Sequence, residues 1–524
     1  MPTKKPGKAT AKKATTKTST AKTGAAKKAV KKSAGKSKTS REVRVRMYRQ
    51  GLGDCFLLTF PRKPEPFHML VDCGALKSKH YGSEEMKEVV RDIQQTIKDE
   101  MATQGAKARL DAVAATHEHW DHISGFADAQ EVFDEIDFKK VWVAWTEEPE
   151  NTAAAQLKKE FKKKKKAVEN ALALIPEEKK GDKRLGVYRK AISELFGFFG
   201  AMGASDGGGR QTTDAAWNYL LEKGRKEYCN PKKRPLEIEG VEGVRVYVLG
   251  PPEDPAYVRM RLSKKETYDE GKHALSLFDS FMAAVAGDDD DDFSGVKERA
   301  FPFDESYRVT KPEESPNAKF FKTRYGFGEG DEGEWRRIDH DWLNMAGELA
   351  LHLDSYTNNT CLAFAIEIGE PGRGKVLLFP GDAQVGNWLS WGDLSWEVKD
   401  SSGEKQKVDI VDLLERTVLY KVGHHGSHNA TLREKGLEKM VSPELVAMIP
   451  VHRKTAEDQA WEFPYPPLWK RLREKARGRV LLADADDISE IEEEAEKMMS
   501  PDEWQRFKNS TAFEPLYVEY RIPY

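Results

Sequence analysis

The strongest chemical signal in the sequence is the run from His117 to His122, His-Glu-His-Trp-Asp-His, which directly follows an apolar stretch. Imidazole nitrogens and carboxylate oxygens are common ligands of divalent metal ions. Two histidines at positions i and i+2 leaving a strand can face one ion, while Asp121 and His122 turn toward a second. The spacing therefore predicts a metal centre with room for two ions.

Two later segments supply further candidate ligands, each at the end of an apolar run. Asp382 follows residues 375–379, and a carboxylate can bridge two cations. His424 and His425 follow residues 417–422 in the same way, and the sequence leaves open which of the two binds. Each signal is weak alone, but the order and the strand-end positions make them support each other.

The elements expected to position these residues are short strands with few helices between them. A helix is predicted for residues 83–101, where apolar residues recur at helical spacing. Strands are predicted for residues 43–48, 55–60, 68–72, 110–116, 141–145, 244–249, 361–368, 375–379, 417–422, 445–449 and 479–482.

With these motifs the chain resembles the metallo-β-lactamase fold superfamily, and within it the soluble hydrolase domain of ComEC-type DNA-uptake proteins. The resemblance covers roughly residues 41–145, 243–252 and 355–485. Besides the run from His117 to His122, it is carried by Gln50-Gly-Leu-Gly-Asp54, Leu70-Val-Asp72-Cys-Gly74, Tyr356-Thr-Asn358-Asn359-Thr360, Pro380-Gly-Asp382 and Val422-Gly-His-His-Gly-Ser427.

The resemblance implies an α/β (α+β) fold, a four-layer αββα sandwich, with a dinuclear zinc or manganese centre that activates water for hydrolysis. It makes Asp121 and Asp382 the central catalytic carboxylates. The implied ligands are His117 and His119 for metal 1, Asp121 and His122 for metal 2, Asp382 as the bridge, and His424 or His425 completing metal 2.

The resemblance also suggests residues around the metals. Asp72 is expected to orient ligands, and Asn358, Asn359, Ser427 and His428 to lie behind the ligands or near the substrate. Asn358 and Asn359 stand where the superfamily has the third histidine of metal 1, so that metal would be completed by water or by His352.

A second departure from the superfamily pattern lies at residues 463–466, Phe-Pro-Tyr-Pro, where ComEC-like domains tend to have a histidine. If that histidine protonates a leaving group, Tyr465 or His428 has to replace it. Three tryptophans, Trp388, Trp391 and Trp396, lie near Asp382 in the sequence and could line a pocket or pack a helix. Trp388 is expected to be a packing residue, and both roles stay open for Trp391.

Charge divides the 524 residues into two unequal parts. The net charge of the whole chain is −2. Residues 1–40 hold 13 lysines and no Asp, Glu or Arg, so their charge is +13 and residues 41–524 carry −15. Such a tail buries too little apolar surface to order and is predicted to be disordered. It can bind nucleic acid through lysines such as Lys4, Lys5, Lys12, Lys13, Lys27, Lys28, Lys31 and Lys32, or serve only to solubilise the chain.

The predicted organisation is therefore a tail over 1–40 and a hydrolase domain over 41–524 with insertions at about 150–240 and 253–340. The first insertion is expected to be helical, with Lys162 to Lys166 as a solvated face or, as the alternative, a second contact with nucleic acid. The second holds Asp288 to Asp292, read as a flexible acidic loop. Oligomeric state is not predicted.

The chain has only four cysteines, no CxxC pair and no long apolar run. These features favour a cytoplasmic protein with no membrane partner. The basic tail also allows association with a bacterial nucleoid. The leading functional hypothesis is a metal-dependent phosphodiesterase or nuclease acting on nucleic acid or nucleotides. The alternatives are a hydrolase of a small ester, lactone or thioester, and a catalytically impaired scaffold associated with nucleic acid.

Overall fold

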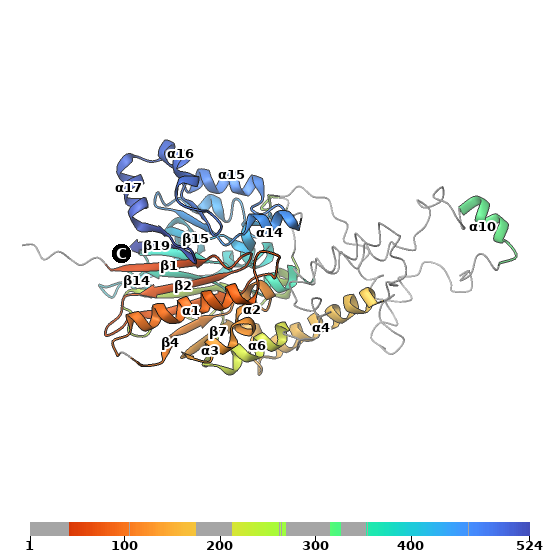
Figure 1. Ribbon diagram of the computed structural model, residues 1–524, viewed down its shortest axis with the longest axis horizontal. Coiled ribbons are helices and arrows are strands. Elements are labelled where there is room, and N and C mark those ends of the chain that lie inside the picture. The colour runs from red at the N-terminus through yellow and green to blue at the C-terminus, as the bar shows by residue number, and fades with distance from the viewer. Residues whose placement is uncertain are drawn as a thin grey trace, which may run out of the picture. The chain divides into compact units, whose positions relative to one another are not determined.

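The computed structural model describes residues 41–103, 105–173, 212–260, 263, 265–268, 315–325, 353, 355–459 and 461–524. Its described part is mixed α/β, with two large sheets and helices (Figure 1). Residues 1–40, the predicted tail with its lysines, lie outside the described residues, and residues 41–524 contain one compact unit. None of the described helices is long and apolar enough to cross a membrane.

The first sheet is antiparallel at one side and parallel at the other. Strands β1 to β3 pair antiparallel, and β3, β5, β7 and β8 pair parallel. Its eight strands in spatial order are β18 (Thr511–Phe513), β19 (Tyr517–Pro523), β1 (Glu42–Tyr48), β2 (Cys55–Phe60), β3 (Phe67–Cys73), β5 (Ala112–Ala114), β7 (Lys140–Ala144) and β8 (Arg225–Cys229).

The second sheet repeats this division. Strands β9 to β12 pair antiparallel, whereas β12, β15, β16 and β17 pair parallel. Its seven strands are β17 (Val480–Leu482), β16 (Val446–Ile449), β15 (Thr417–Lys421), β12 (Lys375–Phe379), β11 (Ala363–Ile368), β10 (Val244–Gly250) and β9 (Leu236–Glu237). Two small sheets pair β13 (Ser395–Lys399) with β14 (Lys405–Asp409), and β4 (Ala108–Leu110) with β6 (Ile136–Phe138).

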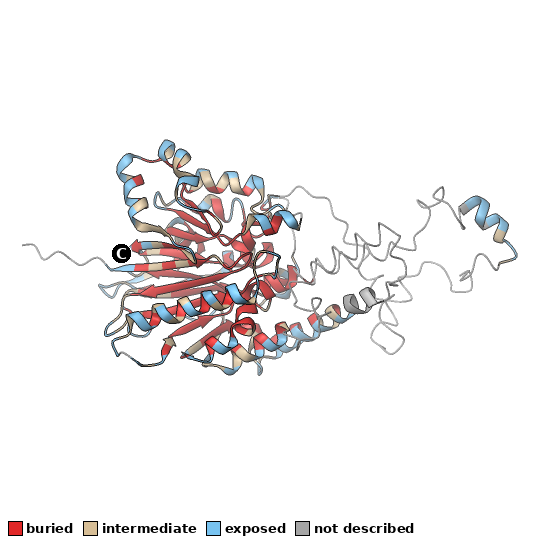
Figure 2. Cartoon of the chain, in the orientation of Figure 1, coloured by how far each residue is buried: buried red, intermediate tan, exposed pale blue. Residues whose placement is uncertain are grey.

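Three buried apolar clusters show which elements pack together. One joins residues of both large sheets, such as Phe56 and Phe364, so these two sheets share a core. A second packs the first sheet against α1 (Ser83–Glu100), α2 (Trp120–Asp128) and α6 (Thr213–Glu222). A third packs the second sheet against α12 (Val385–Ser390), α13 (Ile410–Glu415) and α15 (Pro466–Lys475). Buried residues accordingly fill the strands, and the helices expose one side (Figure 2).

Strand composition explains why the strands run through the interior. All residues of β2, β3 and β15 are buried, as expected for strands covered on both faces. The amphipathic helix α1 buries Met86, Val89, Val90, Ile93 and Ile97, the residues whose spacing predicted it. The predicted strands are confirmed, except that residues 110–116 split at Asp111 into β4 and β5.

The remaining described elements are short helices and one longer helix, α4. They are α3 (Gln130–Phe133), η1 (Trp145–Glu147), α4 (Thr152–Ala173), α7 (Pro255–Val258), α10 (Ala318–Tyr325), η7 (Trp391–Asp393), η8 (Gly423–Gly426), η9 (Leu437–Lys439), α14 (Arg453–Asp458), α16 (Ser489–Met498) and α17 (Pro501–Ser510).

The segment read as a helical insertion at 150–240 is only partly helical. Helices α4 and α6 fit that prediction, but β8 joins the first sheet and β9 joins the second. Asp288 to Asp292 and most of the 253–340 segment lie outside the described residues.

Candidate metal centre

The candidate ligands lie at the ends of parallel strands in both large sheets, which share a core, and parallel pairing places the carboxyl ends at one edge of each sheet. Asp72 closes β3, and the run from His117 to His122 follows β5, which is parallel to β3. Asp382 follows β12, and His424 and His425 follow the parallel strand β15. The sequence folds in this way because each strand has a buried apolar centre, and polar side chains begin at or just after its last residues.

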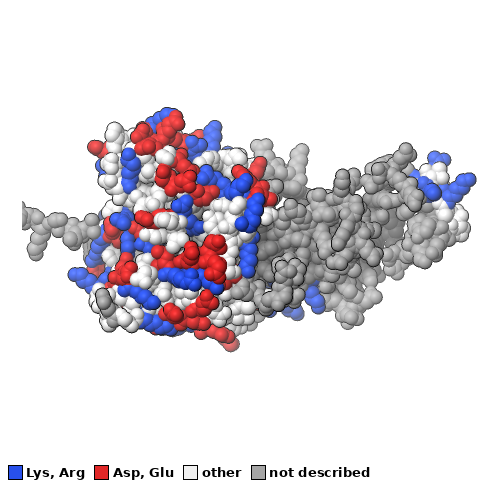
Figure 3. All heavy atoms as spheres, viewed as in Figure 1, with Lys and Arg blue, Asp and Glu red and all other residues white. Residues whose placement is uncertain are grey.

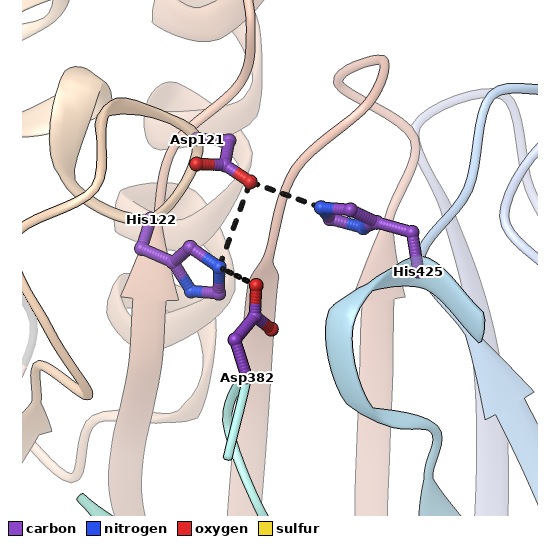
Figure 4. Close-up of side chains that lie close together, drawn as sticks. All are labelled: Asp121, His122, Asp382 and His425. Atoms are coloured by element: carbon purple, nitrogen blue, oxygen red, sulfur yellow. Dashed lines mark hydrogen bonds and ion pairs between the residues drawn. The ribbon is translucent and has the colours of Figure 1, made fainter. Parts of the chain in front are cut away.

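Four of these residues converge on one point: Asp121, His122, Asp382 and His425 (Figure 4). One ligand atom of each lies within 4.8 Å of those of the others, and all four side chains have no exposed surface. Nε2 of His425 is 2.9 Å from Oδ2 of Asp121, and Nε2 of His122 is 3.0 Å from Oδ2 of Asp382. Two His and two Asp at this spacing match the nitrogen and oxygen preferences of zinc and manganese.

The loop that carries Asp121 is held by close backbone packing. His119 stands just before α2, whose first turn contains Asp121. The Asp121 carbonyl accepts a hydrogen bond from the Asp54 amide at 2.9 Å. A Cβ on Gly74 would lie 2.5 Å from the Asp121 backbone, so only glycine fits at that position.

Asp72 fixes the orientation of His122. Its Oδ2 accepts hydrogen bonds from Nδ1 of His122 at 2.8 Å and from the Thr116 hydroxyl at 2.7 Å, while Oδ1 accepts from the Thr116 amide at 2.7 Å. With the Nδ1 hydrogen donated to Asp72, His122 directs Nε2 toward Asp382, where a bound cation would replace the proton on Nε2. Asp72, Asp54 and His122 also form a second close group, so Asp72 lies directly behind the candidate ligands.

The structure places His425, rather than His424, among the four converging residues. Nδ1 of His425 donates to the Pro450 carbonyl at 2.7 Å, which turns Nε2 toward Asp121. His424 is 8% exposed and contacts the Ser427 hydroxyl through Nδ1 at 3.2 Å. Its backbone amide instead donates to Oδ1 of Asp382 at 3.0 Å. Both histidines have positive φ, 45° and 52°, so this turn has an unusual backbone.

His117 and His119 lie beside this group but outside it. The ring of His117 is 4.2 Å from that of His122 and 4.5 Å from that of His119 between centroids. Burial, and then the neighbouring imidazoles, hold the pKa of His117 well below its ordinary value. Burial lowers the pKa of His119 to about 3. Both rings are therefore neutral and retain a lone pair for a metal ion.

The asparagine pair has a structural explanation. Nδ2 of Asn359 donates to the carbonyls of Val258 at 3.2 Å and Met260 at 2.7 Å, and its Oδ1 accepts from the Asn387 amide at 3.0 Å. Both amide hydrogens of Asn359 are thus used by backbone carbonyls, and its contacts tie three separate segments together. Asn358 is fully buried next to it.

The other expected neighbours lie on the His424 side. Ser427 bonds to His424 and to Asn429, both at 3.2 Å. His428 is partly buried, and its ring lies 5.9 Å from that of Tyr465. Phe463 covers this side, with its ring 5.9 Å from His424 and 6.1 Å from His425.

The sequence also offered His352 as a ligand and two tryptophans as packing or pocket residues. His352 lies outside the described residues. Trp388 and Trp391 are packing residues, because both are buried and their rings lie 4.0 Å apart. The indole nitrogen of Trp388 donates to the carbonyls of Ala383 and Ala430.

Sequence reasoning missed two residues of the site, Asp54 and Lys421. The Lys421 ammonium forms an ion pair with Asp54, lies 3.3 Å from Oδ1 of Asp382 and donates to the Gly381 carbonyl at 3.0 Å. Its side chain is 2% exposed. A lysine inside an otherwise apolar strand was the available signal, because a buried lysine requires paired charges.

Carboxylates dominate the electrostatics of the site. Burial disfavours a charged His122, yet Asp382, Asp54 and Asp121 together raise its pKa well above the ordinary value. Burial also opposes ionisation of Asp382, but His122 and Lys421 hold its pKa well below the usual range. The same carboxylates that attract a proton to His122 would attract a divalent cation.

Hydrogen bonding supports metal binding by these residues. Within the described part of the chain, Oδ1 of Asp121, Oδ2 of Asp382 and Nε2 of His117 and His122 are buried without a hydrogen-bond partner. Buried polar atoms in folded proteins are almost always satisfied, and several unsatisfied atoms in one place indicate an absent ion or water. The residues present therefore fit a divalent metal ion.

Adding a divalent ion is expected to stabilise the fold, because only the folded chain assembles these ligands. At a free ion concentration of one hundred times Kd the gain is about 2.7 kcal/mol. For a domain of this size the gain raises Tm by about 3 °C. Thermal unfolding in EDTA and with added Zn²⁺ or Mn²⁺ measures the shift, and Mg²⁺ serves as the control for a non-specific ionic effect. An unchanged Tm at saturating Zn²⁺ and Mn²⁺ would contradict the assignment.

The Asp72→Asn substitution is expected to weaken metal binding about 10-fold to 100-fold. The asparagine keeps the side-chain size but has one acceptor oxygen, so an NH2 group must face either His122 Nδ1 or the Thr116 amide, both of which now donate to Asp72. Competition with a fluorescent chelator gives the affinity. Asp128→Asn, which changes a buried carboxylate of α2 bonded to Ser83, is the control and should leave the affinity unchanged. Equal affinities for Asp72→Asn and the unaltered chain would show that Asp72 does not orient His122.

Comparison with known proteins adds no identification. No protein-family model matches the chain, and a search of curated proteins gave no significant match. The assignment of this site therefore depends on the convergence of its buried histidine and aspartate side chains at the ends of parallel strands.

Proposed function

We propose that this protein is a metal-dependent hydrolase of phosphate esters, most of all phosphodiesters. One observation carries the proposal: four buried ligands, Asp121, His122, Asp382 and His425, converge at the ends of parallel strands with unsatisfied atoms facing one another. The neutral rings of His117 and His119 next to His122 supply ligands for a second ion. Two sheets sharing a core, with helices packed on their other faces, support the four-layer metallo-β-lactamase architecture as part of the proposal.

Divalent ions at such a centre supply a water of lowered pKa as nucleophile and positive charge for the departing oxygen. The chain's own part is to hold and orient the ligands. Asp72 keeps Nε2 of His122 directed at Asp382, and the Pro450 carbonyl keeps Nε2 of His425 directed at Asp121. Lys421 and the His424 amide both hold Oδ1 of Asp382, which leaves its Oδ2 for an ion. Burial of all four ligands excludes bulk water and strengthens each charge interaction.

Turnover by the purified full chain tests the proposal. The substrates are bis(p-nitrophenyl) phosphate and single-stranded DNA, each with added Mn²⁺ or Zn²⁺, beside an Asp121→Ala variant. The expected result is hydrolysis that depends on the added metal and is lost in the variant. Hydrolysis of p-nitrophenyl acetate or a thioester, without any phosphodiester turnover, would replace the proposal with a small-ester hydrolase.

A second candidate is a nucleic-acid-associated protein with a metal site that no longer turns over. Two contacts favour it. Asn359, which stands where a third histidine was expected, donates to the carbonyls of Val258 and Met260, and the Phe463 ring lies 5.9 Å from that of His424. The number of bound ions separates the two candidates. Two ions per chain by elemental analysis favour the hydrolase, while a single ion without phosphodiester turnover favours the scaffold.

Deleting residues 1–40 is expected to weaken binding of single-stranded DNA and flatten its dependence on salt. These residues hold 13 lysines, whereas acidic and basic side chains are interspersed on the visible face of the described part (Figure 3). Loss of about six lysine–phosphate contacts reduces the slope of log K against log salt by about 4. Fluorescence anisotropy over a series of salt concentrations measures the slope. An identical slope for the full and shortened chains would remove the tail from DNA binding.

A further inference from the structure

A cavity of about 610 Å³ reaches the candidate metal centre from one side. One end is formed by Thr116 and His117, and its walls come from α4, α6, the Ala144–Glu147 region and residues 356–360. This volume is typical of sites for small molecules and is sufficient for a ligand of nucleotide size. A molecule that fills this cavity would contact His117, whose ring lies 4.2 Å from that of His122.

Helix α4 turns one face toward this cavity. The lining residues are Leu157, Lys158, Phe161, Lys162, Lys165 and Lys166, at positions i, i+1, i+4, i+5, i+8 and i+9 of a single helical face. Lys162 and Lys166 are exposed, as expected for a solvated face, but they also line the cavity. Lys164, which does not line the cavity, is buried and pairs with Glu160 at 2.8 Å.

Aromatic side chains make part of the wall flat and apolar. Phe161 and Trp217 both line the cavity and are only 8% and 6% exposed. Phe161 stacks on Tyr356, with ring centroids 5.6 Å apart and planes 20° from parallel. Such a wall suits a planar aromatic group of a ligand, because stacking is favourable and tolerant of ring identity.

The rest of the cavity wall carries side chains of both charges. Four lysines line the cavity against three carboxylates, Glu118, Glu147 and Asp214. Glu147 is already engaged, since its Oε2 accepts from Lys158 at 2.7 Å and from the Trp217 indole at 3.0 Å. The α4 side therefore presents Lys162, Lys165 and Lys166 toward the ligand. These lysines and the metal centre at His117 together favour an anion.

We propose that this cavity is the substrate pocket and that its ligand is a small phosphate ester bearing one aromatic ring, of about nucleotide size. This inference rests on the proposed function and narrows it, since it selects a small substrate rather than a nucleic-acid polymer. The aromatic ring lies against Phe161 and Trp217. Lys162 and Lys166 hold the phosphate charge, and the ester faces His117.

Calorimetric titration of the full chain tests the pocket independently of turnover. The probes are adenosine 5′-monophosphate, p-nitrophenyl phosphate and uncharged adenosine, each with EDTA and with Zn²⁺. Lys162→Gln is expected to weaken binding of the two phosphate esters about threefold to tenfold and leave adenosine unchanged. Lys159→Gln makes the same change on the same helix at an exposed position that does not line the cavity, and should alter binding less than about twofold.

A second variant examines the aromatic wall. Phe161→Leu keeps an apolar side chain of similar volume, so folding is preserved, and is expected to weaken all three probes about threefold or more. Binding of neither phosphate ester, or equal affinities in Lys162→Gln and Lys159→Gln, would overturn the pocket. Probe binding sensitive to Lys162, without turnover of any phosphodiester or phosphomonoester, would instead reject the proposed function while retaining the pocket. Turnover of DNA without binding of either phosphate ester would support the proposed function and reject the pocket.

Discussion

Replacing Lys421 with methionine is expected to lower the free energy of unfolding by about 3–5 kcal/mol in EDTA. The ammonium lies between Asp54 and Asp382, whose side chains are 2% and 0% exposed. These carboxylates hold the pKa of Lys421 above its usual value even though burial disfavours the charge. Methionine fills the space but leaves both carboxylates buried without their cation, and unpaired buried charge is among the most destabilising changes known.

Denaturant unfolding in EDTA measures this loss, and a matched lysine provides the control. Lys375 begins β12 and pairs with Glu444 at 2.7 Å, but its side chain is 33% exposed. Lys375→Met is expected to cost less than about 1 kcal/mol, because an exposed ion pair contributes little. Saturating Zn²⁺ should recover part of the Lys421→Met loss, since the ion restores positive charge next to Asp382. Similar losses for the two variants would show that Lys421 does not neutralise the site.

Sequence pattern predicted the strands well because most are continuous apolar runs that end at polar residues. It also placed the ligands at strand ends, and parallel pairing then brings those ends together. Long-range pairing had no local signal. Strand β19 at the end of the chain pairs with β1 along seven residues, and β8 joins the first sheet from within the segment read as an insertion.

Some details of the site could not be predicted from the sequence, because they depend on contacts between distant segments. His424 and His425 are neighbours of the same type, and only the left-handed turn at both residues decides that His425 faces Asp121. The contacts of Asn359 come from Val258, Met260 and Asn387, far along the chain, so its structural role has no sequence pattern. The lysines of α4 similarly resemble a solvated run until α6 and the cavity define one face.

The Asp382→Asn substitution is expected to lower metal-dependent turnover about a thousandfold or more. Asp382 is the carboxylate shared by most of the site: Oδ1 accepts from Lys421 and from the His424 amide, and Oδ2 faces His122. Asparagine retains an oxygen acceptor of the same size but removes the negative charge that holds cations there. Charge stabilisation by metal ions is worth several kcal/mol, and about 4 kcal/mol corresponds to a thousandfold change in rate.

A buried aspartate at the opposite end of β5 distinguishes loss of the site from loss of the fold. Asp111 is 1% exposed and accepts two hydrogen bonds from Arg62, at 3.0 and 2.9 Å. Asp111→Asn makes the same chemical change in another buried ion pair, so we expect lower stability with unchanged bound metal and unchanged turnover per folded chain. Ion content by elemental analysis and turnover of bis(p-nitrophenyl) phosphate are compared for both variants. Full turnover in Asp382→Asn would mean that the chemistry occurs elsewhere, because no site built on this cluster retains its ions without that carboxylate.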